Sequence, residues 1–383
     1  MSRSLRPIVC LSSQYWEGAW FRKHHFMVRF AERGHKIVYV EPSHSLLRRS
    51  GYDRHTRNPL MAAKLARAQP GVWVLTPARL LPKPNGRLVS RLNHRRIVAE
   101  ALRACRGLGL SHPLWWVYDP EFAFSLRQVG GAPIVFDLVD DLIGYEGSRK
   151  RQERIAACVS ELARRATRVL CTSPVLLPQL AAASQPLVVP NGYDSALFRP
   201  RAFANPTHRP TVGLVGTLFD FLDFDLLGNV TEQLPHISFV LVGTIESKDP
   251  RLAEILARAN VTHVGRIPRE AVPDAIAGFD VCIAPFKLGS VARAVSPLKI
   301  YEYLAMHRPV VSTPLESVAK ESIGRFVDFA ASVPEFVGLI EARLRSWPAD
   351  LKALDTVLAS CTWDARFALL LRGLPARLLD DSV

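Results

Sequence analysis

Residues 296–313 read SPLKIYEYLAMHRPVVST, and the fold of the chain can be inferred outward from them. Apolar residues at helical spacing extend to Ala305, and a continuously apolar run, Pro309–Ser312, follows after a short turn. We predict a helix, a turn and a buried strand, with Ser296 as the N-cap and Pro297 in the first helical turn.

The same alternation of strands and helices extends over most of the chain. Continuously apolar strands between helical patterns indicate parallel sheets covered on both faces, the α/β class. The predicted strands are Pro7–Ser12, Lys36–Glu41, Val72–Thr76, Leu114–Tyr118, Ile134–Leu138, Val169–Thr172 and Leu187–Val189, then Thr211–Val215, Ile237–Val242, Val261–Val264, Val281–Ala284 and Pro309–Ser312.

The length of 383 residues predicts two domains, because single cores stop growing near about 250–300 residues. A stretch rich in Pro, Asn and Ala lies between the two series of strands. We predict two Rossmann-like domains facing across a cleft. Their expected bounds are 1–190, a linker at 191–210, 211–333, and C-terminal helices at 334–383 of which the last packs back toward the first domain.

Composition excludes several classes of protein. The six cysteines are scattered and form no CxxC pair, which favours buried thiols in a reducing compartment and no metal site. No apolar run approaches the ~20 residues of a membrane span, and the N-terminus lacks the pattern of a signal peptide. A cytoplasmic location is therefore expected.

Lys299 and Glu302 are the first candidate ligand-binding pair. The free N–H groups of a helix N-terminus form an anion site, and a lysine placed there against the helix dipole suggests an anion bound between them. Glu302 follows on the same face of the helix and suits ribose hydroxyls. A nucleoside diphosphate would fit both, although a capped surface helix with a Lys–Glu pair is an alternative.

A second candidate lies at the end of the predicted strand Ile134–Leu138. Asp137, Asp140 and Asp141 fall at the carboxyl edge of a parallel sheet, where ligands bind. Asp140 is our choice for a general base that deprotonates an acceptor hydroxyl. An acidic turn that only caps a helix is the alternative.

Arg22, His24 and Trp16 form a third group, on the acceptor side. Cationic side chains are unfavourable at a helix start, which suggests a bound anion or sugar, and tryptophans stack on sugar faces. A solvated helix start beside packing tryptophans is the alternative.

The segment 44–106 carries 14 Lys and Arg against two acids, and so most of the net charge of +14. Residues 87–98 within it form a basic amphipathic helical pattern of a kind that binds anionic membranes. A lipid-linked acceptor would fit this location; a solvated basic face is the alternative, and no nucleic-acid module is present.

Six motifs in order resemble the GT-B glycosyltransferases, and most closely the bacterial exopolysaccharide and teichuronic-acid-type enzymes. The resemblance covers most of the chain outside about residues 44–110. The matching stretches are Arg22–Phe26 with Arg33–Ile37, Phe136–Asp141, Val189–Asp194, Gly213–Thr217 with Asp223–Asp225, Ala284–Lys287, and Pro297–Ala305 with its Pro-Val-Val strand.

The resemblance implies a nucleotide-sugar donor, UDP- or GDP-linked, held without a metal cofactor. The implied donor-binding residues are Ser296, Lys299, Glu302, Gly216, Thr217, Arg293 and Tyr301. Asp140 resembles in position the base of xanthan-type glucuronosyltransferases. Two positions depart from the family: Ala294 replaces a first glutamate, and Phe219–Phe221 follow the glycine turn where many members have a basic residue. Retention or inversion stays open, and Arg293 is expected to supply the absent charge.

We therefore predict a glycosyltransferase that moves a sugar onto a lipid-linked glycan acceptor in surface polysaccharide biosynthesis, peripherally on the inner face of the bacterial cytoplasmic membrane. The alternatives are a catalytically degenerate GT-B scaffold in a polysaccharide assembly complex and a sugar-nucleotide epimerase.

Overall fold

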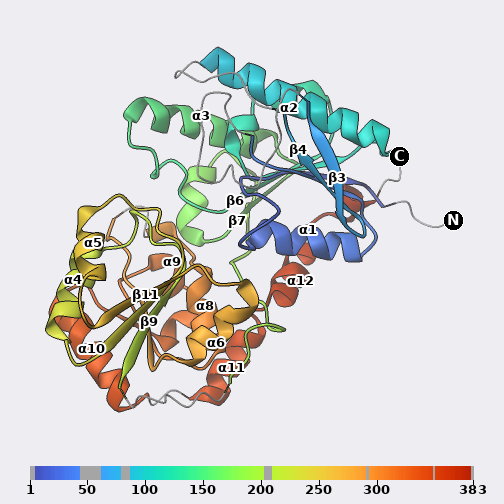
Figure 1. The fold of residues 1–383 in the computed structure, drawn as a ribbon. Coiled ribbons are helices and arrows are strands. Elements are labelled where there is room, and N and C mark those ends of the chain that lie inside the picture. Colours follow the sequence, from blue (N-terminus) through green and yellow to red (C-terminus); the bar gives the residue numbers. More distant parts are fainter. Residues whose placement is uncertain are drawn as a thin grey trace. The chain divides into compact units, whose positions relative to one another are not determined.

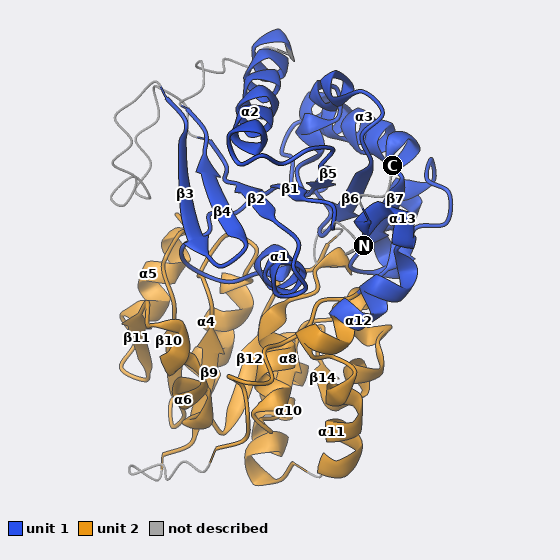
Figure 2. Cartoon of the chain, turned by 90° about the vertical axis from the view of Figure 1, so that its right-hand side faces the viewer, with its two compact units in different colours: residues 1–189, 367–383 blue, residues 190–366 orange. Residues whose placement is uncertain are grey.

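The structure is a computed structural model that describes residues 5–43, 62–78, 87–201, 209–289, 293–347 and 350–380. The chain divides into two compact units, coloured separately in Figure 2. Residues 1–189 and 367–383 form the first unit, and residues 190–366 form the second. By this division the segment expected to be a linker, 191–210, falls within the second unit.

The first unit is built on one eight-stranded sheet of order β3-β4-β2-β1-β5-β6-β7-β8. Its strands are β1 (Ile8–Leu11), β2 (Ile37–Val40), β3 (Lys64–Gln69), β4 (Val72–Thr76), β5 (Leu114–Val117), β6 (Ile134–Leu138), β7 (Arg168–Cys171) and β8 (Leu187–Val188). All neighbours are parallel except β3, which is antiparallel to β4. The sequence analysis missed β3 because five of its six residues are exposed and no apolar run marks this edge strand.

Helices α1 (Arg22–Glu32), α2 (Arg87–Gly107) and α3 (Arg149–Arg165) cover this sheet (Figure 1). Phe30 of α1 is fully buried and meets the ring of Phe367 at 4.8 Å between centroids. The two ends of the chain also meet, because Leu5 pairs with Asp380 and the Arg6 guanidinium donates to the Asp380 carbonyl at 3.0 Å. The last residues of the chain are therefore part of the first unit's body.

The second unit contains a six-stranded, fully parallel sheet of order β11-β10-β9-β12-β13-β14. Its strands are β9 (Thr211–Val215), β10 (Ser238–Val242), β11 (Val261–Gly265), β12 (Val281–Ala284), β13 (Val310–Ser312) and β14 (Val327–Phe329). When the six strands are numbered by their order in the chain, their order across the sheet is 3-2-1-4-5-6. This is the doubly wound Rossmann order, whose ligand crevice lies at the carboxyl ends of the first and fourth strands. The site is therefore expected where β9 and β12 end.

The helices of the second unit pack on both faces of this sheet (Figure 1). They are α4 (Phe224–Gln233), α5 (Pro250–Leu256), α6 (Val272–Ala277), α8 (Leu298–Ala305), α9 (Glu316–Ala319), α10 (Val333–Arg345) and α11 (Leu351–Ala359). The next helix, α12 (Trp363–Gly373), continues into the first unit, which also contains α13 (Ala376–Leu379). Within the described ranges, no helix combines the length and apolar character needed to span a bilayer.

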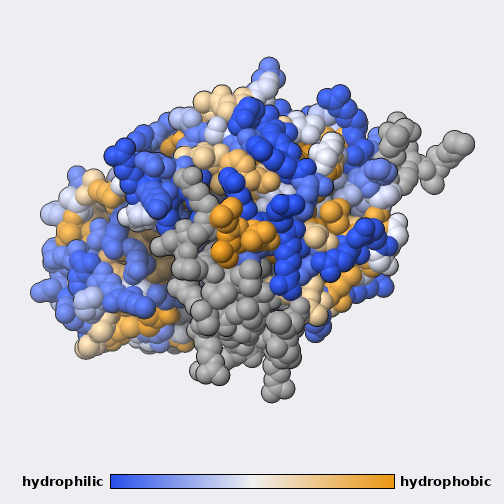
Figure 3. All heavy atoms as spheres, turned by 90° about the horizontal axis from the view of Figure 1, so that it is seen from above, coloured by the Kyte–Doolittle hydropathy of each residue, from blue (hydrophilic) through white to orange (hydrophobic). Residues whose placement is uncertain are grey.

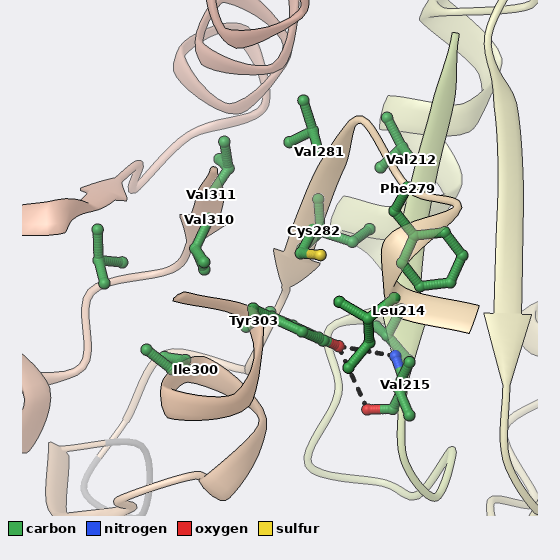
Figure 4. Packing of buried hydrophobic residues seen from close by; sticks show 14 of the residues in the cluster. Val212, Leu214, Val215, Phe279, Val281, Cys282, Ile300, Tyr303, Val310 and Val311 are labelled. Atoms are coloured by element: carbon green, nitrogen blue, oxygen red, sulfur yellow. Dashed lines mark hydrogen bonds between the residues drawn. The ribbon is translucent and has the colours of Figure 1, made fainter. Parts of the chain in front are cut away.

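A buried tyrosine fixes helix α8 against strand β9. The Tyr303 hydroxyl accepts a hydrogen bond from the Val215 N–H at 2.7 Å, in the middle of the apolar cluster of Figure 4. Gly213 faces Phe279 so closely that a Cβ there would lie 2.0 Å from the ring. The Tyr303 bond holds α8 beside the carboxyl end of β9.

Candidate functional site

Two glycines bring the ends of β9 and β10 unusually close together. Gly216 and Gly243 adopt φ angles of +125° and +144°, which side-chain-bearing residues rarely adopt. A Cβ on Gly243 would lie 2.1 Å from the Gly216 carbonyl oxygen. The turn after β9 thus exposes backbone without side chains, as a phosphate-binding turn requires.

Lys299, in the first turn of α8, points its amine at this turn. Its Nζ lies 3.1 Å from the position that a Gly216 Cβ would occupy and 5.5 Å from the centre of the Phe286 ring. The Nζ atom is buried and has no hydrogen-bond partner in the part of the chain that the structure describes. Burial lowers the pKa of Lys299 to about 8, although the nearby Glu302 opposes the shift.

Glu302 lies one turn further along α8. Burial raises the pKa of this carboxyl to about 7, while Arg269 and Lys299 act in the opposite direction. Arg269 is itself paired with Asp194 at 2.8 Å. The structure thus brings together Gly216, Lys299 and Glu302, a glycine turn with a buried cation and a carboxyl whose charge depends on pH near neutrality.

The prediction that Ser296 caps helix α8 was wrong. Helix α8 begins at Leu298 with Pro297 as its N-cap, so Ser296 is not the capping residue. The Ser296 hydroxyl lies 3.1 Å from the Tyr301 hydroxyl, which in turn donates to Glu321 at 2.7 Å. Both side chains are buried and used inside the second unit, because hydroxyl groups excluded from water take protein partners.

The expectation that Arg293 supplies the absent charge is not supported by its position. Arg293 is exposed, and its guanidinium forms an ion pair with Glu316 at 2.6 Å. Lys299 is the cation that reaches the glycine turn, although it comes from the helix and not from the loop after β9. Thr217 follows the turn and accepts a hydrogen bond from the Thr244 hydroxyl at 3.4 Å.

Arg22, predicted on the acceptor side, is buried and paired inside the first unit. It is 2% exposed, and its Nε donates to Asp137 at 2.9 Å while an Nη donates to the Val189 carbonyl at 2.6 Å. A buried carboxylate 115 residues away compensates the charge that appeared unfavourable in the sequence.

His24 and Trp16 belong to an aromatic cluster behind the loop after β1. The His24 ring is fully buried, with Nε2 2.8 Å from the Tyr15 carbonyl and 3.1 Å from the Tyr39 hydroxyl. His24 therefore anchors the loop and is not available to bind an anion. Trp16 is half-buried and packs edge-on against Tyr39 at 5.0 Å, so part of its surface faces solvent.

Asp140 lies just beyond β6, at the carboxyl edge of the first sheet. Burial raises the pKa of this carboxyl to about 6, against the effect of Lys23 and of a hydrogen bond with Tyr145. The next residue, Asp141, is used in the turn, where it accepts from the Gly144 N–H at 2.8 Å and from Gln179 at 2.7 Å. Asp140 is thus the carboxyl of the pair suited to exchange a proton near neutral pH.

Lys23 is a site residue that the sequence analysis did not single out. Its amine is buried, donates to the Ser13 hydroxyl at 2.7 Å and lies 5.0 Å from the Tyr118 ring. Burial lowers the pKa of Lys23 to about 8, while Asp140, Asp137 and Asp119 oppose the shift. Lys23 lies three residues before Phe26 and therefore on the same buried face of α1. Only this spacing in the sequence could have indicated that Lys23 is buried.

One group of candidate metal ligands occurs among the described residues, comprising His94, Asp119 and Glu121. The guanidinium of Arg154 contacts Glu121 and already compensates its charge. The group therefore provides no argument for a metal in the reaction.

Comparison with known proteins agrees with the fold and the motifs. Residues 209–340 match the family model described as glycosyl transferases group 1. The chain is 28% identical over 225 residues to TuaH of Bacillus subtilis strain 168, which is described as a teichuronic acid biosynthesis glycosyltransferase. That alignment covers 54% of this chain and 56% of TuaH, so it spans about half the length of the curated relative.

Two solved structures are similar over nearly their whole length. Sucrose-phosphate synthase of Thermosynechococcus elongatus has a TM-score of 0.69 at 18% identity, covering 96% of this chain and 98% of its own. Anabaena HepE in complex with UDP and glucose has a TM-score of 0.65 at 13% identity, covering 96% and 99%.

The chain therefore has the GT-B fold, and residues 209–340 of its second unit match the group 1 glycosyltransferase model. This confirms the fold class and the resemblance inferred from the motifs. Among proteins of this kind the chain is similar to TuaH, which is named for teichuronic acid biosynthesis.

Proposed function

We propose that this protein transfers a sugar from a nucleotide-sugar donor to a glycan acceptor in the biosynthesis of a surface polysaccharide. The observation that carries the proposal is the buried amine of Lys299, which has no hydrogen-bond partner among the described residues and is directed at the glycine turn after β9. A buried cation without hydrogen-bond partners is costly even with a carboxyl nearby, and a diphosphate is the anion that this class of fold accommodates.

The two units have separate roles in the proposed reaction. In the second unit, Lys299 offsets the negative charge on the departing diphosphate, while Glu302 binds ribose or donor hydroxyls. In the first unit, Asp140 accepts the proton of the acceptor hydroxyl if the reaction inverts, and orients the acceptor if it retains. We expect no metal to be required, because lysine and helix N–H groups can compensate the diphosphate charge.

A panel of UDP-, GDP- and dTDP-sugars tests the proposal by thermal shift, because a bound donor stabilises the folded state by mass action. A shift with one nucleotide class would support the donor site and identify the base. Binding without transfer to any acceptor would instead favour a non-enzymatic role in an assembly complex. No shift with any nucleotide would contradict the donor site.

The affinity for UDP should fall at alkaline pH. The free amine of Lys299 has a pKa of about 8, and a bound diphosphate raises that pKa, so binding takes up a proton above pH 8. We expect the dissociation constant to rise by up to about tenfold per pH unit above this value. Isothermal titration calorimetry in buffers of different ionisation enthalpy measures both the affinity and the proton uptake.

Uridine is the matched control for this pH dependence, because it lacks the phosphates that Lys299 would contact. Its affinity should change little over the same pH range. A UDP affinity that is independent of pH, with no proton uptake, would contradict the assignment of Lys299 to the diphosphate.

We further propose that α2 attaches the protein to an anionic membrane, on the cytoplasmic side, where a lipid-linked acceptor would be available. Leu88 and Leu92 are 74% and 55% exposed on this helix, and Arg91, Arg95 and Arg96 are exposed around them. Figure 3, which views the molecule from above relative to Figure 1, shows hydrophobic residues among hydrophilic ones on this face. Residues 44–61 and 79–86 of the basic segment lie outside the described residues.

Removing charge and apolar surface from α2 should weaken membrane binding. Replacing Arg91 and Arg95 by glutamine should lower partitioning onto vesicles that contain phosphatidylglycerol by about 10- to 30-fold, at roughly 1 kcal/mol per charge. Replacing Leu88 and Leu92 by glutamate should have a similar effect. Vesicle sedimentation measures both.

Leu351→Glu serves as the control, because Leu351 is 42% exposed on α11 in the second unit. It should leave vesicle binding unchanged. Equal binding of wild type to neutral phosphatidylcholine vesicles, or unchanged binding of both double variants, would overturn the membrane proposal.

A further inference from the structure

A closed ring of hydrogen bonds lies in the second unit beneath the start of α8. Five residues from five segments form it. The Ser296 hydroxyl meets the Tyr301 hydroxyl at 3.1 Å, Tyr301 donates to Glu321 Oε1 at 2.7 Å, and Arg366 donates to Glu321 Oε2 at 2.9 Å. Arg366 Nε also donates to the Asn191 carbonyl at 3.0 Å, and the Asn191 amide donates to the Ser296 carbonyl at 2.9 Å.

The ring is shielded from water and tightly enclosed. Ser296, Tyr301 and Arg366 are 5%, 0% and 8% exposed. Next to Asn191, a Cβ on Gly192 would lie 2.7 Å from the Cys361 carbonyl oxygen, so the backbone approach at this point requires glycine. Breaking any bond of the ring leaves a buried polar group unpaired, which favours a single arrangement, although Asn191 Oδ1 itself has no hydrogen-bond partner among the described residues.

Arg366 is the member that connects the most segments. Its two donor nitrogens reach the Asn191 carbonyl and Glu321, whose other oxygen holds Tyr301. A lysine could not make both bonds at once, since only the planar guanidinium presents donors in a fixed fork. Ser296, two residues before α8, is thus held at its carbonyl by Asn191 and at its hydroxyl by Tyr301. Arg366 contacts the first of these partners directly and the second through Glu321.

We propose that Arg366 and Glu321 are positioning residues for diphosphate binding, acting through Ser296 to set the first turn of α8 and the direction of the Lys299 amine. This inference rests on the proposed function. Neither residue was singled out from the sequence, and the ring gives Ser296 and Tyr301 a supporting role in place of direct donor contact.

The test compares the affinities of UDP and uridine for the full-length protein and its variants. Arg366→Met should weaken UDP binding by about tenfold, because the amine and N–H groups that face the phosphates lose their orientation. Uridine affinity should stay within about twofold, since only the phosphate contacts depend on the ring. Calorimetry, or competition with a fluorescent nucleotide, measures both affinities.

Arg343→Met is the matched control for general destabilisation. Arg343 also forms a two-pronged ion pair within the second unit, with Asp328 at 2.6 and 2.7 Å, and connects β14 to α10 instead of the start of α8. It should lower the melting temperature while leaving the ratio of UDP to uridine affinity unchanged. If Arg366→Met does not fold, Arg366→Lys serves, because it retains the charge and loses one of the two bonds.

A fall in the ratio of UDP to uridine affinity that is confined to the Arg366 variants would support the positioning role. An unchanged ratio in a folded Arg366 variant, or an equal fall in Arg343→Met, would overturn it while leaving the donor site intact. If wild type itself binds neither UDP nor GDP, the proposed function fails and this inference falls with it.

Discussion

Lys299→Met is expected to make the ligand-free protein more stable and to remove its response to UDP. The folded environment lowers the pKa of Lys299 from 10.5 to about 8, so the charged amine costs on the order of 1–3 kcal/mol at neutral pH. Methionine fills a similar volume without that cost. Glu302, left without its cation, can remain protonated because its own pKa is raised to about 7.

The sign of this effect can be checked against pH. A pKa lowered by folding destabilises the folded state below about pH 8, and the penalty disappears as pH rises toward 10.5, where the unfolded amine also loses its proton. The stabilisation by methionine should therefore be largest at neutral pH and shrink in alkali. Calorimetric melting with and without UDP measures both effects.

Lys287→Met is the control for Lys299→Met. Lys287 is exposed, three residues after β12, and should alter neither stability nor UDP binding appreciably. A Lys299→Met protein that still binds UDP with wild-type affinity would show that the buried amine does not serve the diphosphate.

Asp140→Asn is expected to lower kcat by about 10²–10⁴-fold, the usual contribution of a general base, while leaving donor affinity nearly unchanged. In wild type, kcat should decline as pH falls below about 6, because the raised pKa of Asp140 means that its basic form is lost there. Initial rates of transfer at saturating donor, measured across pH, provide both results once an acceptor is known.

Asp141→Asn provides the neighbouring comparison. It weakens the turn bonds to Gly144 and Gln179, so we expect a lower melting temperature with kcat within about tenfold of wild type. If both variants lose kcat equally, the loss reflects the shape of the turn and Asp140 is not the base. If Asp140→Asn loses only a little of its kcat, a retaining reaction would be favoured.

Most of the fold could be predicted because its strands are buried on both faces. Continuously apolar runs mark β1, β9 and β12 directly in the sequence. The strands β3 and β14 escaped notice because one is exposed and polar and the other has three residues. Neither carries the periodicity on which such a prediction depends.

The candidate site was only partly predictable. Lys299 and Glu302 were recognisable because they share one helix face. Arg22 and His24 have the same residue types as ligand-binding groups, but their partners lie on distant segments such as Asp137 and Tyr39. One sequence shows which side chains carry charge, and tertiary contacts alone decide whether that charge is already compensated.

The return of the chain after Arg366 affects the order in which the protein can be assembled. Phe367 and the residues after it cover Phe30 of α1, and Asp380 pairs with Leu5. During synthesis from the N-terminus, the first unit therefore cannot be completed until the whole second unit has left the ribosome. Until then α1 lacks the cover of Phe367, and a nonsense mutation within the second unit removes part of both units.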